Sequence, residues 1–196
     1  MEGLLLINLS ALLAGFLLGS IPSAYLLGRW LGHADIRQIG SGSVGGMNAL
    51  RNIGVVVGVL TILSDLAKGL GAAWIALHLS SQPLIWALTP VFLTAGHMWT
   101  PWLRGRGGKG LTVTGAYLLY LALDQRGWGV VVWLALLVVA TLSFRDTDRG
   151  TVVASLSLPW AAYRAFPEAP EAGVLAGVLW TAVFVLRHIP LILHSR

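Results

Sequence analysis

The sequence predicts an all-α fold: a polytopic membrane bundle of seven transmembrane helices that forms a single domain over residues 1–196. Two of the observations behind this prediction are compositional. Of the 196 residues 56% are hydrophobic and only 11% are charged, and the mean hydropathy is +0.77, whereas a soluble domain carries about 25% charged residues. The third observation is that Lys and Arg are concentrated in alternate connections between the apolar runs, which is typical of a chain that crosses a bilayer repeatedly.

The apolar runs follow one another along the chain. The first, Gly3 to Gly28, contains no charged residue and exceeds the roughly 20 residues that a helix needs to cross the hydrocarbon core. No clear polar cleavage region follows it and further apolar runs do, so we interpret it as a span and not as a signal peptide. Several later runs are short, which indicates tilted, broken or re-entrant pieces. The predicted spans are 4–28, 54–79, 83–99, 111–123, 129–144, 151–166 and 172–190.

The connections between these spans differ in charge. Of the 13 Lys and Arg residues, only Arg126 and Arg164 fall in one alternating set, and Lys68 lies inside a span. Because basic loops remain in the cytoplasm, the N-terminus is predicted outside and the C-terminus in the cytoplasm. Charge spread over several loops also argues against a nucleic-acid-binding face. The cytoplasmic cations are then Arg29, Arg37, Arg51, Arg104, Arg106, Lys109, Arg145, Arg149, Arg187 and Arg196.

The first basic connection contains the glycine-rich stretch "IGSGSVGGMNALRNIG", Ile39 to Gly54. Successive glycines allow backbone N–H groups to converge on an anion, and Arg51 supplies a fork that suits phosphate. The stretch satisfies G-x-G-x-x-G, but no strand precedes it, so it does not indicate a dinucleotide site. A flexible loop beside the membrane is the alternative. The candidate phosphate contacts are Gly40, Ser41, Gly42, Ser43, Asn48 and Arg51.

The second basic connection is "RGRGGKG", Arg104 to Gly110, in which Lys109 stands between glycines. It is not a Walker loop, since its spacing fails and Gly110 stands where Ser or Thr is required. His97 ends the preceding span, and an imidazole with an unperturbed pKa of about 6.5 suits a proton carrier. Alternatively, the basic residues of this loop only keep it in the cytoplasm, and His97 only packs against neighbouring side chains. We expect both glycine-rich loops to converge on one phosphate beside His97.

Charged groups also occur inside and beside the spans. Asp65 and Lys68 have i, i+3 spacing in the second span, which predicts a pair that braces the helix, with Lys68 as a further candidate for the cytoplasmic site. In "RDTDR" the carboxylates of Asp146 and Asp148 stand beside two arginines, and no third ligand is evident, so we expect salt bridges and no metal site. The chain has no cysteine, which excludes thiolate chemistry. We expect neither a cofactor nor a metal.

Several motifs resemble those of the bacterial acyl-phosphate:glycerol-3-phosphate acyltransferases of the PlsY type, in the same order and over almost the whole chain. They are "GSIPSAYLLGR" (Gly19 to Arg29), "DIRQIGSGSVGGMNALR" (Asp35 to Arg51), "DLAKG" (Asp65 to Gly69), "GHMWTPWLRGRGGKG" (Gly96 to Gly110) and "RH" (Arg187 and His188). The resemblance implies a seven-span enzyme of the bacterial inner membrane. Such an enzyme moves a fatty acyl group from acyl-phosphate to the 1-hydroxyl of glycerol 3-phosphate, giving lysophosphatidic acid and phosphate. The implied surroundings are the lipid bilayer and a soluble enzyme that makes acyl-phosphate.

The resemblance also implies roles for the matching residues. His97 and Ser41 would be the catalytic residues, with backbone N–H groups near Ser41 stabilising the developing oxyanion. The substrate hydroxyl would attack the acyl carbonyl directly, without an acylated serine. His97 would accept the proton, or it would orient the hydroxyl while the phosphate of the substrate accepts it. The implied substrate-binding residues are Gly40, Gly42, Ser43, Asn48, Arg51, Gly108, Lys109, Arg149, Ser155 and His188.

The chain departs from the family pattern at several polar positions, among them Ser43, Met47, Val152 and Leu191, with Pro190 in place of the Glu before the last of these. Ser43 can still donate a hydrogen bond, but Met47, Val152 and Leu191 cannot. Each uncompensated loss of a hydrogen bond to a charged group costs about 1.5–3 kcal/mol. These departures keep open a non-catalytic relative that binds phospholipid precursors or partners, and the basic loops keep open a small-anion transporter.

Overall fold

The computed structural model describes residues 2–126 and 128–194, and within these ranges the chain is helical and contains no strand. The all-α prediction is therefore confirmed, whereas Arg196, counted above among the cytoplasmic cations, lies outside the described residues. The elements are α1 (Glu2–Ser20), α2 (Ser23–Leu31), η1 (Ile36–Gln38), α3 (Gly46–Asn52), α4 (Val55–Leu79), α5 (Pro83–Met98), η2 (Pro101–Leu103), α6 (Leu111–Leu121), the π-helical η3 (Ala122–Arg126), α7 (Trp128–Phe144), α8 (Thr147–Ser155), α9 (Leu158–Ala165) and α10 (Pro170–His194).

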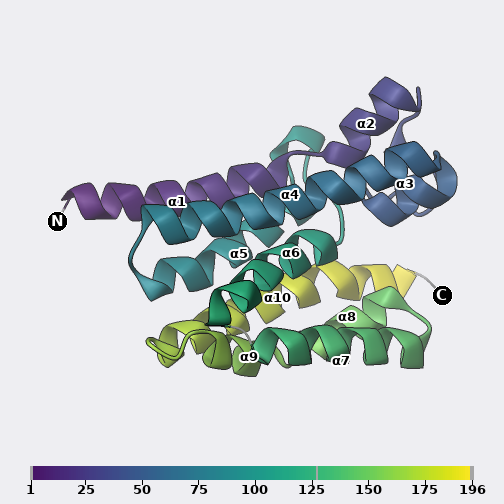
Figure 1. The fold of residues 1–196 in the computed structure, drawn as a ribbon. Coiled ribbons are helices and arrows are strands. Elements are labelled where there is room, and N and C mark those ends of the chain that lie inside the picture. Colours follow the sequence, from purple (N-terminus) through teal and green to yellow (C-terminus); the bar gives the residue numbers. More distant parts are fainter. Residues whose placement is uncertain (1, 127, 195–196) are drawn as a thin grey trace.

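The helices form two groups that lie one above the other in Figure 1. Helices α1, α4, α5 and α6 pack together in the upper group, and α7, α8, α9 and α10 pack together in the lower group. The contact between α5 and α10 joins the groups. The start of α1 and the end of α10 lie at opposite ends of the molecule.

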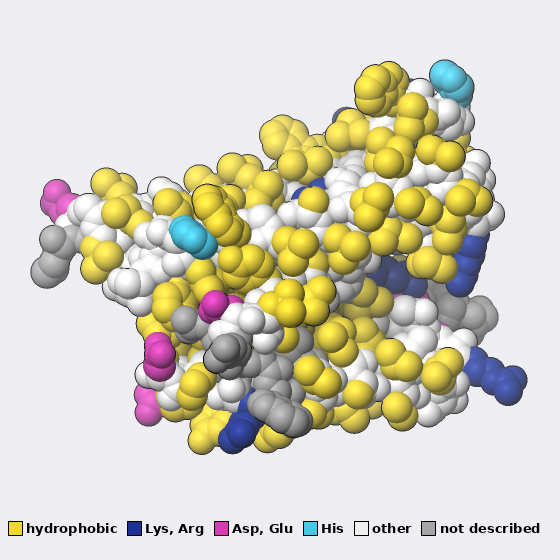
Figure 2. Space-filling view, viewed as in Figure 1, with side chains coloured by type: hydrophobic (Ala, Val, Ile, Leu, Met, Phe, Trp, Pro, Cys, Tyr) yellow, Lys and Arg dark blue, Asp and Glu magenta, His cyan; other side chains and the backbone are white. Residues whose placement is uncertain are grey.

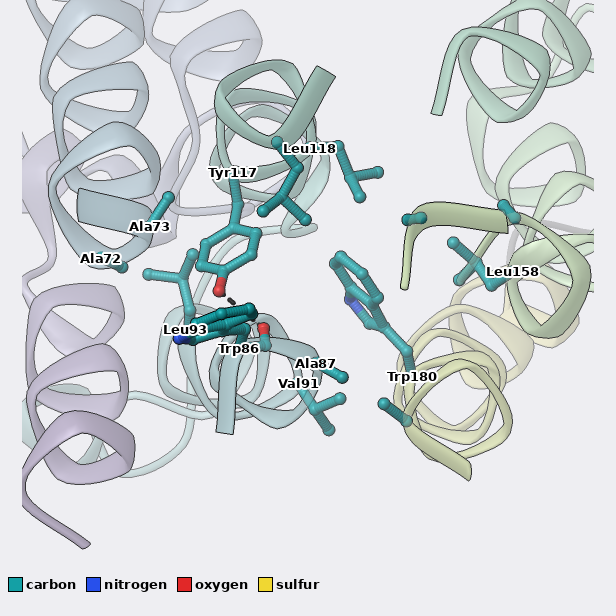
Figure 3. Close-up of a cluster of buried hydrophobic side chains, with 14 of the residues drawn as sticks. Ala72, Ala73, Trp86, Ala87, Val91, Leu93, Tyr117, Leu118, Leu158 and Trp180 are labelled. Atoms are coloured by element: carbon teal, nitrogen blue, oxygen red, sulfur yellow. Dashed lines mark hydrogen bonds between the residues drawn. The ribbon is translucent and has the colours of Figure 1, made fainter. Parts of the chain in front are cut away.

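An aromatic cluster fills the junction between the groups (Figure 3). The Tyr117 hydroxyl on α6 donates a hydrogen bond to the Trp86 carbonyl on α5 (2.7 Å). Across the cluster, the Trp180 indole on α10 donates to Thr94 Oγ1 on α5 (3.0 Å). Tyr117 and Trp180 thus place their apolar rings in the core and still satisfy their polar atoms, whereas the indole nitrogen of Trp133 in the same cluster is buried without a hydrogen-bond partner. This junction fixes α5 and α10, which later prove to carry His97 and Arg187.

Close helix packing depends on glycine at Gly69, where α4 crosses α6. An alanine Cβ there would overlap the Val113 carbonyl and the Ala116 side chain. We expect Gly69→Ala to destabilise the fold by about 1–3 kcal/mol, because overpacking forces the two helices apart. Gly71→Ala is the matched control on the same helix, since Gly71 faces open space, and there alanine should add about 0.5–1 kcal/mol. Thermal unfolding in detergent measures both, and equal melting temperatures would contradict this expectation.

The predicted span 151–166 is wrong as a single helix. Helix α8 ends at Ser155 and α9 begins at Leu158. Pro159 has no N–H with which to continue the helical hydrogen bonding to the Ser155 carbonyl. That carbonyl instead accepts a hydrogen bond from the Thr181 hydroxyl on α10 (2.6 Å). The chain can bend here because the carbonyl left free at the break receives a hydrogen bond from a neighbouring helix.

The predicted span 4–28 is also divided, at Ile21 and Pro22, between α1 and α2. The Ile21 carbonyl at the break accepts a hydrogen bond from Lys68 Nζ (2.7 Å), and the same ammonium pairs with Asp65 Oδ1 at 2.7 Å. Both side chains are buried. The predicted Asp65–Lys68 pair is therefore confirmed, and it braces the α1–α2 junction as well as its own helix.

The outer surface is rich in apolar side chains, as Figure 2 shows. Three helical segments are long and apolar enough to cross a membrane: Glu2–Leu31, Val55–Leu79 and Pro170–Leu193. Leu111–Asp124 and Val131–Phe144 are shorter apolar helices. Lys and Arg gather mainly at the end of the molecule that carries α3 and the end of α10, and Asp and Glu gather mainly at the other end. This surface suits a helix bundle surrounded by lipid.

Candidate active site

A cavity of about 420 Å³ opens where the two glycine-rich connections meet. The loop before α3, the end of α5, the loop before α6 and the start of α8 contribute its walls. The convergence of both loops beside His97 is thus found in the structure. Of the predicted site residues, the cavity is lined by Ser41, Ser43, Asn48, Arg51, His97 and Lys109. Lining residues for which the sequence predicted no contact include Asp65, Thr112 and Thr147.

The first loop is held in shape by the Asn48 side chain. Asn48 Nδ2 donates hydrogen bonds to the carbonyls of Ser43 (2.9 Å) and Ile39 (3.0 Å), and Oδ1 accepts one from the Ser41 N–H (3.2 Å). The loop needs positive φ at Gly40 (56°), and a side chain there would overlap the amide of Asn48. The Asn48 amide hydrogens therefore form hydrogen bonds within the loop and are not available to a phosphate, contrary to the prediction.

The free backbone donors lie later in this loop than predicted. The Ser41 N–H is taken by Asn48, and the Gly42 N–H donates to the Ile39 carbonyl (3.1 Å). Gly46 and Met47 begin α3 and also line the cavity. First-turn N–H groups have no acceptor within their own helix, and within the described chain neither of these two N–H groups forms a hydrogen bond. The oxyanion donors expected near Ser41 are thus better supplied by Gly46 and Met47.

Two cations face the cavity, Arg51 and Lys109. Arg51 is exposed, and among residues 2–126 and 128–194 no carboxylate lies within ion-pair distance of it. Arg37, on the same connection, is committed elsewhere: it pairs with Asp35 at 2.7 Å and lies over the Tyr25 ring. The Arg37 guanidinium lowers the pKa of Asp35 to about 2. Arg51 is therefore the cation of the first loop that remains available to a phosphate.

The second loop folds back onto the end of α5. The Gly107 N–H donates to the Met98 carbonyl (3.0 Å) and the Gly108 N–H to the His97 carbonyl (3.1 Å). His97 is only 8% exposed, and a Cβ at Gly108 would overlap its imidazole. Glycine is therefore required at position 108 so that the backbone can lie against the His97 ring. Gly108 itself positions the loop and does not line the main cavity.

Arg187 on α10 also holds the second loop, and the sequence did not predict this. Its Nη2 donates to the Gly107 carbonyl (2.7 Å) and its Nε to the Gly108 carbonyl (3.2 Å). The only signal was its place in the "RH" motif, because a backbone carbonyl as partner leaves no mark in the sequence. Arg187 thus holds the two peptide groups that directly precede Lys109 in the chain.

We expect Arg187→Met to lower kcat/KM about 10- to 100-fold, because two charge-assisted hydrogen bonds to the loop are lost. Arg187→Lys should lose less, since an ammonium can still reach one carbonyl. Steady-state kinetics of the purified protein in lipid measure both. Arg164→Met, an exposed arginine on α9 that forms no contact with the cavity, is the matched control. Equal activity of Arg187→Met and Arg164→Met would show that Arg187 does not hold the loop in the working protein.

The two aspartates of "RDTDR" form different salt bridges. Asp146 pairs with the neighbouring Arg149 at 3.6 Å, as predicted. Asp148 does not pair with an adjacent arginine: both of its oxygens lie 2.7–2.8 Å from Lys109 Nζ, 39 residues away. No group of three or more potential ligands that could hold a metal occurs in the described ranges.

Besides Gly40, Gly42 and Gly108, three more predicted substrate-binding residues lie outside the cavity walls. Arg149 lies on the outer face of α8 in a shallow groove with Phe144 and Val152. Ser155 is buried, and its hydroxyl donates to the Val152 carbonyl (2.7 Å). His188 is buried behind Asp148, with Nε2 3.7 Å from Asp148 Oδ1. The first two are therefore not placed for direct contact with a ligand in this cavity, and His188 is one layer behind it.

A protein-family model described as glycerol-3-phosphate acyltransferase matches residues 9–194 of the chain. The chain belongs to this family. Glycerol-3-phosphate acyltransferase 1 of Dehalococcoides mccartyi is 39% identical over 189 residues, which are 95% of this chain and 88% of the relative. The glycerol-3-phosphate acyltransferase of Mesorhizobium japonicum is 37% identical over 175 residues, 89% and 86% of the two chains. The family predicted from the motifs is confirmed.

Solved structures agree with the fold of this glycerol-3-phosphate acyltransferase family member. Two crystal structures of PlsY, an integral membrane glycerol 3-phosphate acyltransferase, match with a TM-score of 0.74 each, at 24% and 22% identity. Each match covers 96% of this chain and 91% of the other. One is the glycerol 3-phosphate form and the other the lysophosphatidic acid form.

The departures from the family pattern fall in different surroundings. Ser43 and Met47 line the cavity, so Met47 replaces a polar wall position by an apolar one. Val152 lies in the outer groove beside Arg149, and Leu191 is partly buried near the end of α10. Of Met47, Val152 and Leu191, Met47 is therefore the one that contacts the space available to a ligand.

Proposed function

We propose that this chain transfers a fatty acyl group from acyl-phosphate to the 1-hydroxyl of glycerol 3-phosphate, the first step of bacterial phospholipid synthesis. The supporting observation is that Arg51 and Lys109, from loops far apart in the sequence, face one cavity next to His97. Two cations suit a phosphate dianion, and the family supplies the acceptor substrate. The phosphate of glycerol 3-phosphate lies between these two cations, which directs its carbon chain toward His97.

The reaction is a direct displacement at the acyl carbonyl. The 1-hydroxyl oxygen bonds to the carbonyl carbon, the bond from that carbon to the phosphate oxygen breaks, and the hydroxyl proton passes to His97. His97 then returns the proton to the departing phosphate, so the protein is unchanged. The N–H groups of Gly46 and Met47 stabilise the oxyanion, and the Ser41 hydroxyl contacts the substrate. No cofactor takes part.

The protein is placed in the bacterial inner membrane with seven spans, the N-terminus outside, and the cavity and C-terminus in the cytoplasm. The gathering of basic side chains at the cavity end supports this orientation. The acyl chain leaves the cavity past Met47 and Leu111 into the space between helices. A soluble enzyme supplies acyl-phosphate at the same face.

Purified protein in lipid nanodiscs, given palmitoyl-phosphate and glycerol 3-phosphate, tests the function. We expect release of phosphate together with lysophosphatidic acid, and no release when glycerol replaces glycerol 3-phosphate. Phosphate release that does not depend on the acceptor would indicate hydrolysis only. No release at all would favour the non-catalytic relative, for which Met47 in the cavity wall is the motivating observation.

A further inference from the structure

Lys109, the proposed phosphate ligand, is already bound to a carboxylate of the same chain. Asp148 Oδ1 lies 2.7 Å and Oδ2 2.8 Å from Lys109 Nζ. The pair is partly buried, with 28% of the Lys109 side chain and 18% of the Asp148 side chain exposed. Because Lys109 is paired with Asp148, Arg51 is the one cavity-lining cation in the described chain that has no carboxylate partner.

Asp148 depends on Lys109 for a side-chain hydrogen bond, because its other neighbours do not donate one. His188 Nε2 lies 3.7 Å from Asp148 Oδ1 and is buried without a hydrogen-bond partner. His188 Nδ1 lies 2.9 Å from the Phe184 carbonyl and must donate to it. A neutral His188 then presents a lone pair at Nε2 and cannot donate to the carboxylate. Lys109 is therefore the side chain in the described ranges that donates a hydrogen bond to Asp148.

A phosphate that enters the cavity competes with Asp148 for the same ammonium group. We propose that Asp148 is a positioning residue that weakens substrate binding by holding Lys109, and so sets the KM for glycerol 3-phosphate. This inference rests on the proposed function. The same competition helps the phosphate group of the product to leave, because the carboxylate returns to Lys109. Asp148 thus keeps the affinity of the cationic site in a range that permits turnover.

The test compares Asp148→Asn with Asp146→Asn in full-length protein in nanodiscs. Both variants lose one carboxylate from the same turn, but Asp146 does not contact Lys109. We expect Asp148→Asn to lower the KM for glycerol 3-phosphate about fivefold to tenfold and to leave kcat no higher than in the wild type. Asp146→Asn should leave KM unchanged. Equilibrium binding of glycerol 3-phosphate without acyl-phosphate should tighten by the same factor, and inhibition by lysophosphatidic acid should strengthen.

An unchanged or higher KM in Asp148→Asn, with unchanged or weaker binding, would overturn the inference and leave Asp148 as a support for Lys109. If Asp148→Asn does not fold, Asp148→Ser is measured against the same criteria. Wild-type protein without acyl transfer would instead refute the proposed function. The two failures are therefore distinguishable in one set of measurements.

Discussion

Turnover falls by about 10²–10⁴-fold when His97 is replaced by alanine, if the imidazole moves the hydroxyl proton as proposed. His97 lies in the cavity wall, almost fully buried, with Gly108 packed against its ring. Alanine removes the only imidazole that lines the cavity within the described chain. Lysophosphatidic acid formation from palmitoyl-phosphate, measured in nanodiscs, gives kcat directly. The KM for glycerol 3-phosphate should change little, because Arg51 and Lys109 remain.

Two further variants show what a loss of turnover in His97→Ala means. His78→Ala removes an exposed histidine that stacks on Trp74 far along α4, and we expect wild-type turnover. His97→Gln keeps hydrogen-bonding capacity but cannot accept a proton at neutral pH. Turnover within about tenfold of the wild type in His97→Gln would assign His97 an orienting role and the proton to the substrate phosphate. Full activity of His97→Ala would remove His97 from the mechanism.

Gly108→Ala should lower kcat/KM by about 10²-fold, the second-largest effect that we expect. The new Cβ would overlap the His97 imidazole and lie close to the Val44 carbonyl, so the loop, the ring or both must shift. Displacement of catalytic groups by about 1 Å can cost 10²-fold, and Lys109 follows directly in the chain. Steady-state kinetics together with thermal unfolding separate this local effect from a loss of folding.

Gly115→Ala on α6 is the matched control for Gly108→Ala. A Cβ at Gly115 would make only an ordinary contact, with Leu134 at 4.0 Å. We expect its activity to equal that of the wild type and its stability to rise slightly. Wild-type kinetics in Gly108→Ala would mean that the loop can move away from His97 without disturbing Lys109.

The pattern of apolar runs predicted the helices well but not their breaks. Hydropathy alone does not say whether a carbonyl orphaned by proline will find a donor, and that decides where a helix can end inside a bundle. The Thr181 hydroxyl provides this donor for Ser155, and at the other break Lys68 donates to the Ile21 carbonyl in addition to the Ser23 N–H. The Thr181 and Lys68 side chains come from other helices, so the bends at these positions became visible only in three dimensions.

For the site, residue types predicted the two loops and His97, because glycine, hydroxyl and basic side chains are unusual in an apolar chain. The pairing of Asp148 with Lys109 was not predicted, since it joins residues 39 positions apart. Asn48 was assigned to the phosphate, whereas its amide is used up by loop carbonyls. Chemical type therefore indicated where the site is, and long-range geometry decided which groups are free.

The Arg187 contact with the second loop has a consequence for biosynthesis. Arg187 belongs to α10, which leaves the ribosome after every other helix of this sequence. Until that helix inserts and docks, the peptides before Lys109 lack two of their hydrogen bonds. A nascent chain arrested before α10 would therefore hold both loops yet be a poor catalyst, so activity reports that α10 has docked.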